Sequence, residues 1–365
     1  MSVTDLTAPA RADEYRARLA SLWERNLGTA VTDDDDYFRA GGDSLLGTQL
    51  IIWIEENFGV ELSLLDIFES RTVAAQTQLV LERLATSGPA AERRPVEYDF
   101  FGPPGARLFG AMHRPQAGRA AGGVLLCYPM GQEYMRIHRT YVELARSLAA
   151  AGFYALRFDY YGCGDSAGDS DEGDFARWSD DIRLAADELR SRAGVRDLFI
   201  VGSRVGANLV LDVSRDGGFD AAGLVLWEPI VSGAHYLAAL RRAHHDLLAS
   251  NAILDGYEQR ARTGYPAEFV GFPLPQKLYD EVAGIDLLAT ARGASLPPAL
   301  LLTNSDKPAL GELAAVLVDG RRNELDCVTA LESDGIWLRE DRQNKGLIPA
   351  RAIQAVVSWV SRRAA

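Results

Sequence analysis

The sequence predicts a small bundle of four helices followed by a larger α/β unit with a mostly parallel sheet. Acidic residues are concentrated at the start, because residues 1–87 hold 15 acidic residues against 7 arginines, a net charge of −8. Residues 88–95 are polar and show no apolar periodicity, which is typical of a linker. In residues 96–365, continuous apolar runs alternate with helical patterns, which favours a sheet buried on both faces. We therefore expect two domains joined by a short linker.

The composition of the whole chain limits the kinds of partner and the cellular compartment that we expect for it. The 365 residues carry a formal net charge of −13 and are 47% hydrophobic, and there are 3 cysteines. The excess of acid argues against nucleic acid and against an anionic membrane surface, and no apolar run is long enough to span a bilayer. The cysteines are too few and too scattered for a disulfide framework or a metal cluster. We expect a cytoplasmic protein without a bound metal.

The acidic first segment reads as four short helices. Residues 11–26 place apolar side chains on one helical face, and a second helix is expected from the glycine turn at residue 41 to Gly59. A third helix is predicted over 63–69 and a fourth over 73–86. A domain this small and this acidic is not typical of a catalyst, and it favours a module that a partner protein holds.

The glycine turn before the second helix carries the firmest functional signal. The segment reads Asp36-Tyr37-Phe38, then Gly41-Gly42-Asp43-Ser44-Leu45. The glycines allow a tight turn, and a serine at the start of a helix is exposed where the helix dipole favours a phosphate group. This motif resembles the carrier-protein motif of non-ribosomal peptide synthetases over roughly residues 8–87. The resemblance implies 4′-phosphopantetheine on Ser44, with Asp43 beside it, and a phosphopantetheinyl transferase as partner.

The second segment shows six apolar runs that we expect as strands, and helical patterns lie between several of them. The runs are Val124–Cys127, Tyr154–Phe158, Leu198–Val201, Leu224–Trp227, Ala299–Leu302 and Leu325–Ala330. The helical patterns are Tyr141–Ala151, Trp178–Arg192 and Ala207–Ser214. Glu97–Phe101 and Leu108–His113 are expected as a leading hairpin. Residues 232–290 interrupt the alternation with a helical, aromatic-rich insertion that would form a lid.

That order of elements resembles the α/β-hydrolase superfamily. Residues 126–131 follow the third strand, where the family places its oxyanion loop, and residues 198–207 occupy the position of the nucleophile elbow. The runs 132–135 and 161–166 resemble, more narrowly, hydrolases associated with exosortase systems. The resemblance implies an α/β-hydrolase fold whose oxyanion side is formed by Met130, Gly131 and Val205.

The elbow lacks the expected nucleophile. In Gly-x-Ser-x-Gly the serine stands midway between two glycines. Here the glycines are Gly202 and Gly206, so Arg204 takes the middle position and Ser203 falls one residue early.

The histidine of a catalytic triad is missing as well. A triad in this fold takes its histidine from the loop after the last strand, yet none of the 5 histidines lies beyond residue 245. Asp306 could be the acid of a triad, but an acid without the serine and the histidine cannot carry out the triad mechanism. We therefore predict no ordinary serine hydrolysis.

Three interpretations of the second domain stay open. In the first, Arg204 holds a substrate carboxylate or steadies an enolate or oxyanion, and Glu228 or Glu133 acts as the base. In the second, the domain is a non-catalytic platform that shields the thioester and docks partner enzymes. In the third, it is a thioesterase that releases the cargo through Ser203.

The fusion itself suggests a biosynthetic role. A carrier followed by an α/β-hydrolase domain resembles the end of a peptide synthetase, and a tether raises the effective concentration of the cargo at a nearby pocket. We expect a stand-alone didomain that processes an acyl or aminoacyl thioester by a mechanism without a triad. We expect its loading enzyme, such as an adenylation domain, to act in trans, and tailoring enzymes to act on the cargo.

Overall fold

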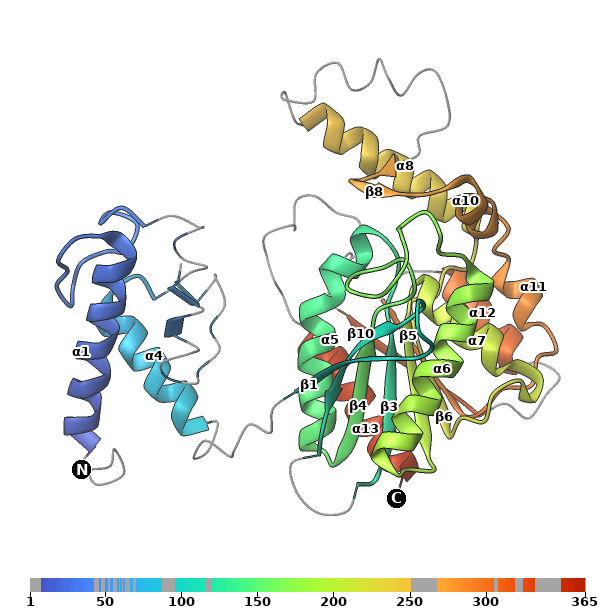
Figure 1. The fold of residues 1–365 in the computed structure, drawn as a ribbon, viewed down its shortest axis with the longest axis horizontal. Coiled ribbons are helices and arrows are strands. Elements are labelled where there is room, and N and C mark those ends of the chain that lie inside the picture. Colours follow the sequence, from blue (N-terminus) through green and yellow to red (C-terminus); the bar gives the residue numbers. More distant parts are fainter. Residues whose placement is uncertain are drawn as a thin grey trace. The chain divides into compact units, whose positions relative to one another are not determined.

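The computed structural model describes residues 8–42, 70–86, 96–115, 120–250, 268–304, 308–318, 324–331 and 349–364, together with single positions between 46 and 67. Within the chain, contacts define one compact unit over Met1–Arg93 and a second that begins at Arg94 (Figure 1). This division falls inside the predicted linker. None of the helices in the described part of the chain is both long and apolar enough to cross a bilayer.

The first unit is helical, as predicted. Its two fully described helices are α1, Ala8–Leu27, and α4, Val73–Thr86, which pack against each other. Side chains from both helices and from the segment between them form a small core that includes Leu19, Trp23, Tyr37, Ile54 and Val80. The predicted second and third helices lie largely outside the described residues, although the described positions within them are mostly helical.

The second unit is built on an eight-stranded sheet. Its strands are β1 Glu97–Phe101, β2 Leu108–His113, β3 Gly122–Cys127, β4 Phe153–Phe158, β5 Leu198–Ser203, β6 Gly223–Trp227, β9 Ala299–Asn304 and β10 Leu325–Leu331. Their order is β1-β2-β4-β3-β5-β6-β9-β10. β1 and β2 pair antiparallel, as does β2 with β4, and the other pairs are parallel. The predicted strands and leading hairpin are confirmed.

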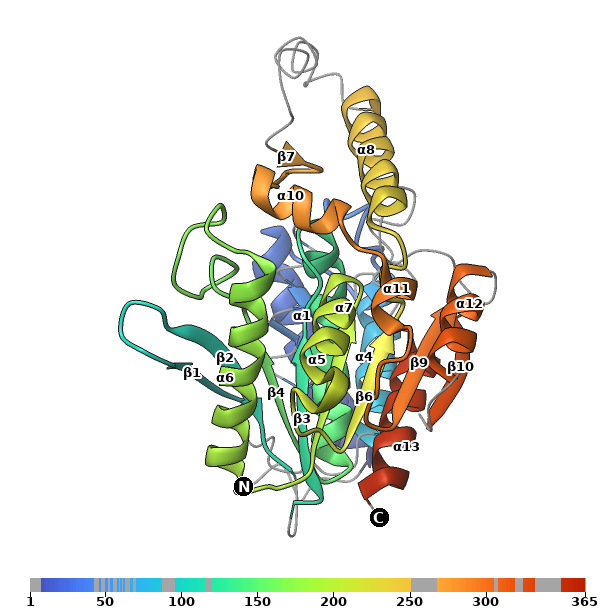
Figure 2. The same cartoon turned by 90° about the vertical axis from the view of Figure 1, so that its right-hand side faces the viewer.

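Helices cover both faces of this sheet. They are α5 Gln132–Ala150, α6 Phe175–Ala193, α7 Val205–Ser214, α12 Pro308–Val318 and α13 Ala350–Ala364. α6 and α7 contact each other on one face, in front in Figure 2, while α5 and α13 contact each other on the other face. A short 3₁₀ turn, Arg215–Gly217, follows α7. The fully buried strands β3, β5 and β6 lie between these layers, which explains their uninterrupted apolar sequences.

The lid insertion contains more than helices. It begins with α8, Gly233–Ser250, and ends with α10, Gln276–Ala283, and α11, Leu287–Ala291. Between them a small hairpin pairs β7, Glu268–Phe269, with β8, Phe272–Pro273. The hairpin was not predicted, because two-residue strands leave no periodic pattern. α8 and α10 lie beyond one end of the sheet (Figure 2).

One predicted boundary is wrong in a way that affects the site. Sequence patterning placed the start of the helix after β3 at Tyr141, but α5 begins at Gln132. Its buried side includes Ile137, Tyr141, Leu144 and Leu148, a spacing that continues back through the first turns. Glu133 therefore lies in the first turn of a helix and not in the oxyanion-side loop.

Candidate functional site

The elbow between β5 and α7 keeps the backbone of a nucleophile elbow. Arg204 stands between the two elements with φ 53° and ψ −124°, a left-handed conformation that is rare for a residue with a side chain. The flanking glycines are required. A Cβ on Gly206 would lie 2.4 Å from the carbonyl oxygen of Tyr128, and one on Gly202 would lie 2.6 Å from that of Gly206. The strained turn thus presents Arg204 where the fold normally presents its nucleophile.

The guanidinium of Arg204 connects three elements. Its Nε donates to Glu133 Oε1 of α5 at 3.0 Å, and its Nη1 donates to the carbonyl oxygen of Glu228 after β6 at 3.1 Å. Its Cζ lies 5.5 Å from the ring centroid of Tyr236 on α8. The side chain is only 11% exposed. Burial lowers its pKa, but Glu133, Tyr236 and Glu228 outweigh burial and raise the pKa overall, so the group stays charged.

Glu133 is the main partner of this arginine. Its side chain is 1% exposed, and its second oxygen, Oε2, accepts a hydrogen bond from the hydroxyl of Tyr236 at 3.1 Å. Burial, together with the Glu133 charge, raises the pKa of Tyr236, so the phenol keeps its proton. Tyr236 was not predicted as a site residue. It lies 103 residues from Glu133 in the sequence, and no local pattern links the two.

Ser203 lies beneath the elbow, inside the protein core. It is completely buried, and its Oγ accepts a hydrogen bond from the hydroxyl of Tyr141 at 2.9 Å. The same hydroxyl lies 3.1 Å from the carbonyl oxygen of Cys127. This placement explains the serine as a polar group satisfied within the core, and it does not favour attack on a substrate.

Glu228 completes the polar end of the sheet. It directly follows β6, is completely buried, and has a φ of 44°. Its N–H donates to the carbonyl oxygen of Leu302 at 2.9 Å. Two residues with side chains, Arg204 and Glu228, thus hold positive φ at the carboxyl ends of adjacent strands. Such strain is found most often where function requires a fixed geometry.

The residues predicted for the oxyanion side lie where strands give way to helices. Met130 and Gly131 follow β3, and Gly131 has a φ of 59° directly before α5. Val205 is the first residue of α7, so its N–H has no acceptor inside that helix. The positive end of the α7 dipole adds to the field of the Arg204 guanidinium, so this point favours negative charge on a ligand atom.

A pocket opens between α5 and the lid, next to this polar cluster. It is a shallow cleft that is open to solvent, and the space of about 290 Å³ that it borders includes part of that solvent. Its lining residues come from the oxyanion loop, the start of α5, α8 and the β7–β8 hairpin: Met130, Gly131, Gln132, Glu133, Tyr236, Leu240, Phe269, Phe272, Pro273 and Leu274. The carboxylate of Glu133 thus belongs both to the ion pair and to the pocket wall.

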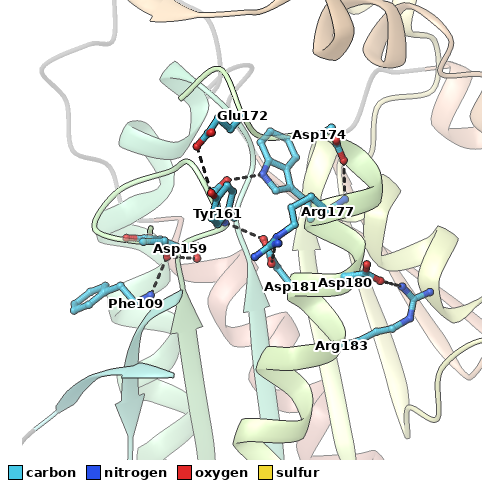
Figure 3. A network of polar contacts seen from close by, with 11 residues as sticks. Phe109, Asp159, Tyr161, Glu172, Asp174, Arg177, Asp180, Asp181 and Arg183 are labelled. Atoms are coloured by element: carbon cyan, nitrogen blue, oxygen red, sulfur yellow. Dashed lines mark hydrogen bonds and ion pairs between the residues drawn. The ribbon is translucent and has the colours of Figure 1, made fainter. Parts of the chain in front are cut away.

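The turn after β4 is a rigid support. Asp159 accepts hydrogen bonds from the hydroxyl of Tyr134 at 2.7 Å and from the N–H of Asp165 at 3.1 Å, and burial raises its pKa. The N–H of Tyr161 and the Nε of Arg177 both donate to Asp181, at 2.9 and 3.1 Å. Figure 3 shows the hydrogen bond from Tyr161 to Asp181, which ties the turn to α6. The run 161–166 therefore lies in a turn that these hydrogen bonds hold in place.

The carrier residues Asp43 and Ser44, and the acid Asp306, lie outside the described residues. The residues on either side of Ser44 fit an attachment site. A Cβ on Gly42 would lie 2.4 Å from the buried ring of Tyr37, so only glycine fits this turn. On the other side, the carbonyl oxygen of Leu46 accepts from Asn26 Nδ2 at 3.1 Å. Gly42 and Leu46, which stand on either side of Ser44 in the sequence, therefore both contact other parts of the helical unit.

Two family models match the chain, one in each unit. The phosphopantetheine attachment site matches residues 17–80, and the serine aminopeptidase S33 family matches residues 131–259.

The curated relatives match the first unit. A probable non-canonical nonribosomal peptide synthetase, CymA, from Salinispora arenicola is 42% identical over 78 residues, which is 21% of this chain and 1% of the relative. Surfactin synthase subunit 1 from Bacillus subtilis is 35% identical over 91 residues, 25% of this chain and 2% of the relative. The chain spans less than a tenth of the length of these relatives.

Solved structures match the second unit in fold. A soluble variant of monoglyceride lipase from Saccharomyces cerevisiae has a TM-score of 0.52 at 13% identity, covering 75% of this chain and 97% of that one. An esterase from Pyrococcus furiosus has a TM-score of 0.51 at 14% identity, covering 74% and 92%.

Together these findings define the class of the protein. The chain joins a phosphopantetheine carrier domain, similar to those of nonribosomal peptide synthetases, to an α/β-hydrolase domain. The carrier domain bears 4′-phosphopantetheine as its prosthetic group.

Proposed function

We propose that this didomain holds an acyl or aminoacyl thioester on the arm at Ser44 and processes it without forming an acyl-enzyme. One observation carries the proposal: the position of the nucleophile is occupied by Arg204, which is locked to Glu133 at 3.0 Å. The pathway we infer is one of natural-product biosynthesis.

A covalent route has no residue to begin it. A charged guanidinium cannot attack a carbonyl, and Ser203 is buried against Tyr141. None of the 5 histidines follows residue 245, so the segment after the last strand supplies no histidine as a base. The elbow geometry is retained, while the serine and the histidine that a triad needs are absent from their expected positions.

The groups that remain suit proton transfer. When attached, the arm presents its cargo as a thioester, whose carbonyl acidifies the adjacent C–H group. A carboxylate oxygen of Glu228 or Glu133 would take that proton. The guanidinium of Arg204 and the N–H of Val205 would then face the negative charge on the carbonyl oxygen. Return of the proton, or loss of a leaving group from the next carbon, would complete the step.

The partners follow from the carrier. We expect a phosphopantetheinyl transferase to modify Ser44 and an adenylation or synthetase enzyme to load the arm in trans. Tailoring enzymes would act on the cargo before its release. We propose a cytoplasmic location, where these enzymes and their cofactors meet.

Deuterium exchange tests the proposal. The carrier is loaded with an aminoacyl pantetheine, incubated in D₂O, and followed by intact-protein mass spectrometry. We expect uptake of deuterium at the carbon beside the carbonyl, or loss of a small neutral molecule. Glu228→Gln and Arg204→Lys should slow either change at least tenfold, whereas Ser203→Ala should leave it unaltered. Release of the acyl group that depends on Ser203 would overturn the proposal.

A second candidate, a non-catalytic platform, is favoured by one observation. Arg204, Glu133 and Tyr236 contact one another within the protein, as in a purely structural cluster. In that case the loaded protein would show no mass change in any variant, and the hydrolase domain would only lengthen the lifetime of the thioester.

A further inference from the structure

The pocket under the lid has one polar end and apolar walls. Its walls are formed by side chains from the oxyanion loop, α8 and the β7–β8 hairpin, namely Met130, Leu240, Phe269, Phe272 and Leu274. Its polar side chains are Gln132, Glu133 and Tyr236. Among the described residues that line it there is no lysine, arginine, serine or threonine.

Among the described side chains, the polar end offers several acceptors, and the amide NH₂ group of Gln132 is its remaining donor. Glu133 is a carboxylate, which can only accept, and each of its oxygens keeps a further lone pair beyond the bonds to Arg204 and Tyr236. The single hydroxyl hydrogen of Tyr236 is given to Glu133, so its oxygen can only accept.

The side-chain oxygen of Gln132 is a further hydrogen-bond acceptor at this end of the pocket. Its Oε1 is buried, and no donor in the described part of the chain bonds to it. A buried acceptor without a partner is unfavourable, and a ligand that supplies the missing donor recovers that free energy. Because the terminal torsion of glutamine is soft, the side-chain amide can reorient toward a donor on a ligand.

We propose that this pocket selects an aminoacyl thioester with an apolar side chain, and that the α-amino group of the cargo binds to Gln132 and Glu133. The inference rests on the proposed function, because it takes the tethered cargo as the ligand of the pocket. The amine supplies donors to the acceptors of Gln132 and Glu133, and the phenol oxygen of Tyr236 accepts where geometry allows. The apolar side chain packs against the aromatic residues of the hairpin. A simple acyl chain lacks the donors and leaves the polar end unsatisfied.

Matched ligands test the selection. The full chain with Ser44→Ala, which holds no arm, is titrated calorimetrically with leucyl-pantetheine and with 4-methylpentanoyl-pantetheine, each made stable by an amide in place of the thioester. The two probes differ only in the amino group. We expect the leucyl probe to bind about tenfold more tightly, as for one or two hydrogen bonds to a charged group.

Three variants separate the contributions. Gln132→Leu should reduce the preference for the leucyl probe to about threefold or less. Phe272→Ala should lower the affinity for both probes by the same factor and leave the ratio of the two affinities unchanged, because it removes only an apolar part of the pocket lining. Gln354→Leu, an exposed position on α13, is the matched control and should change neither affinity. Thermal unfolding of each variant checks its folding.

The outcomes separate this inference from the proposed function. Equal affinities, no binding of either probe, or an unchanged ratio in folded Gln132→Leu would overturn the inference. A clear preference for the leucyl probe, combined with no deuterium uptake by the loaded protein, would leave the selection standing and remove the proposed chemistry. Deuterium uptake by the loaded protein without a preference for the leucyl probe would support the proposed chemistry and overturn the selection.

Discussion

Removing the side chain of Arg204 should strongly destabilise the α/β-hydrolase domain. Arg204→Ala leaves the carboxylate of Glu133, which is 1% exposed, without its ion-pair partner. Breaking a buried pair from one side costs about 3–5 kcal/mol, because a buried charge is left uncompensated. For a domain of this size, each kcal/mol lowers Tm by roughly 2–4 °C, so we expect a fall of about 6–20 °C.

The partner charge provides the internal control. If the loss of stability comes from the unpaired carboxylate of Glu133, the double variant Arg204→Met with Glu133→Leu should recover most of that stability. Apolar replacements of buried ion pairs are often neutral in stability. Arg183→Ala removes an exposed pair with Asp180, whose side chains are 43% and 77% exposed, and should cost less than about 1 kcal/mol.

Differential scanning calorimetry of the full chain measures these effects. The two units are expected to unfold in separate transitions, so the transition of the hydrolase domain is followed by itself. An Arg204→Ala variant whose transition lies within about one degree of wild type would refute the description of a buried, mutually dependent pair.

Two further predictions concern pH and the carrier turn. Burial, then the charges of Arg157 and Arg146, lowers the pKa of His113 to about 3, so folding stability falls as pH drops below about 6.5, by about 2 kcal/mol at pH 5. His113→Gln should remove that part of the difference in the free energy of unfolding between pH 7 and pH 5, measured by chemical denaturation. An unaltered difference would contradict this prediction. Gly42→Ala forces a Cβ against the ring of Tyr37 and should destabilise the carrier unit by about 1–3 kcal/mol. In calorimetry only the carrier transition should move; a shift of the other transition would contradict the assignment.

The sheet could be predicted from the sequence because its signals are local. Buried parallel strands such as β3 and β5 are uninterrupted apolar runs, and glycine spacing alone placed Arg204 at the elbow. The frame of the elbow is fixed by steric limits at Gly202 and Gly206, which leave no room for a Cβ. Both features can therefore be predicted without any knowledge of contacts between distant residues.

The remaining parts of the site depend on contacts between distant residues. Tyr236 reaches Glu133 from the lid, and Gln132 became a pocket residue only because α5 begins earlier than its patterning suggested. The polar start of α5 hides its helical period, since Gln132 and Glu133 face a pocket rather than solvent. The burial of Ser203 against Tyr141 likewise follows from packing across 62 residues of sequence.

The most direct test of the account locates the acyl group. The protein is loaded at Ser44 with a radiolabelled aminoacyl pantetheine, incubated, quenched in acid and digested, and the labelled peptides are identified by mass spectrometry. The account predicts that all the label stays on the peptide that contains Ser44, in wild type and in Ser203→Ala alike. Label on the peptide that contains Ser203 and Arg204 in wild type, and its absence in Ser203→Ala, would show an acyl-enzyme and contradict the account.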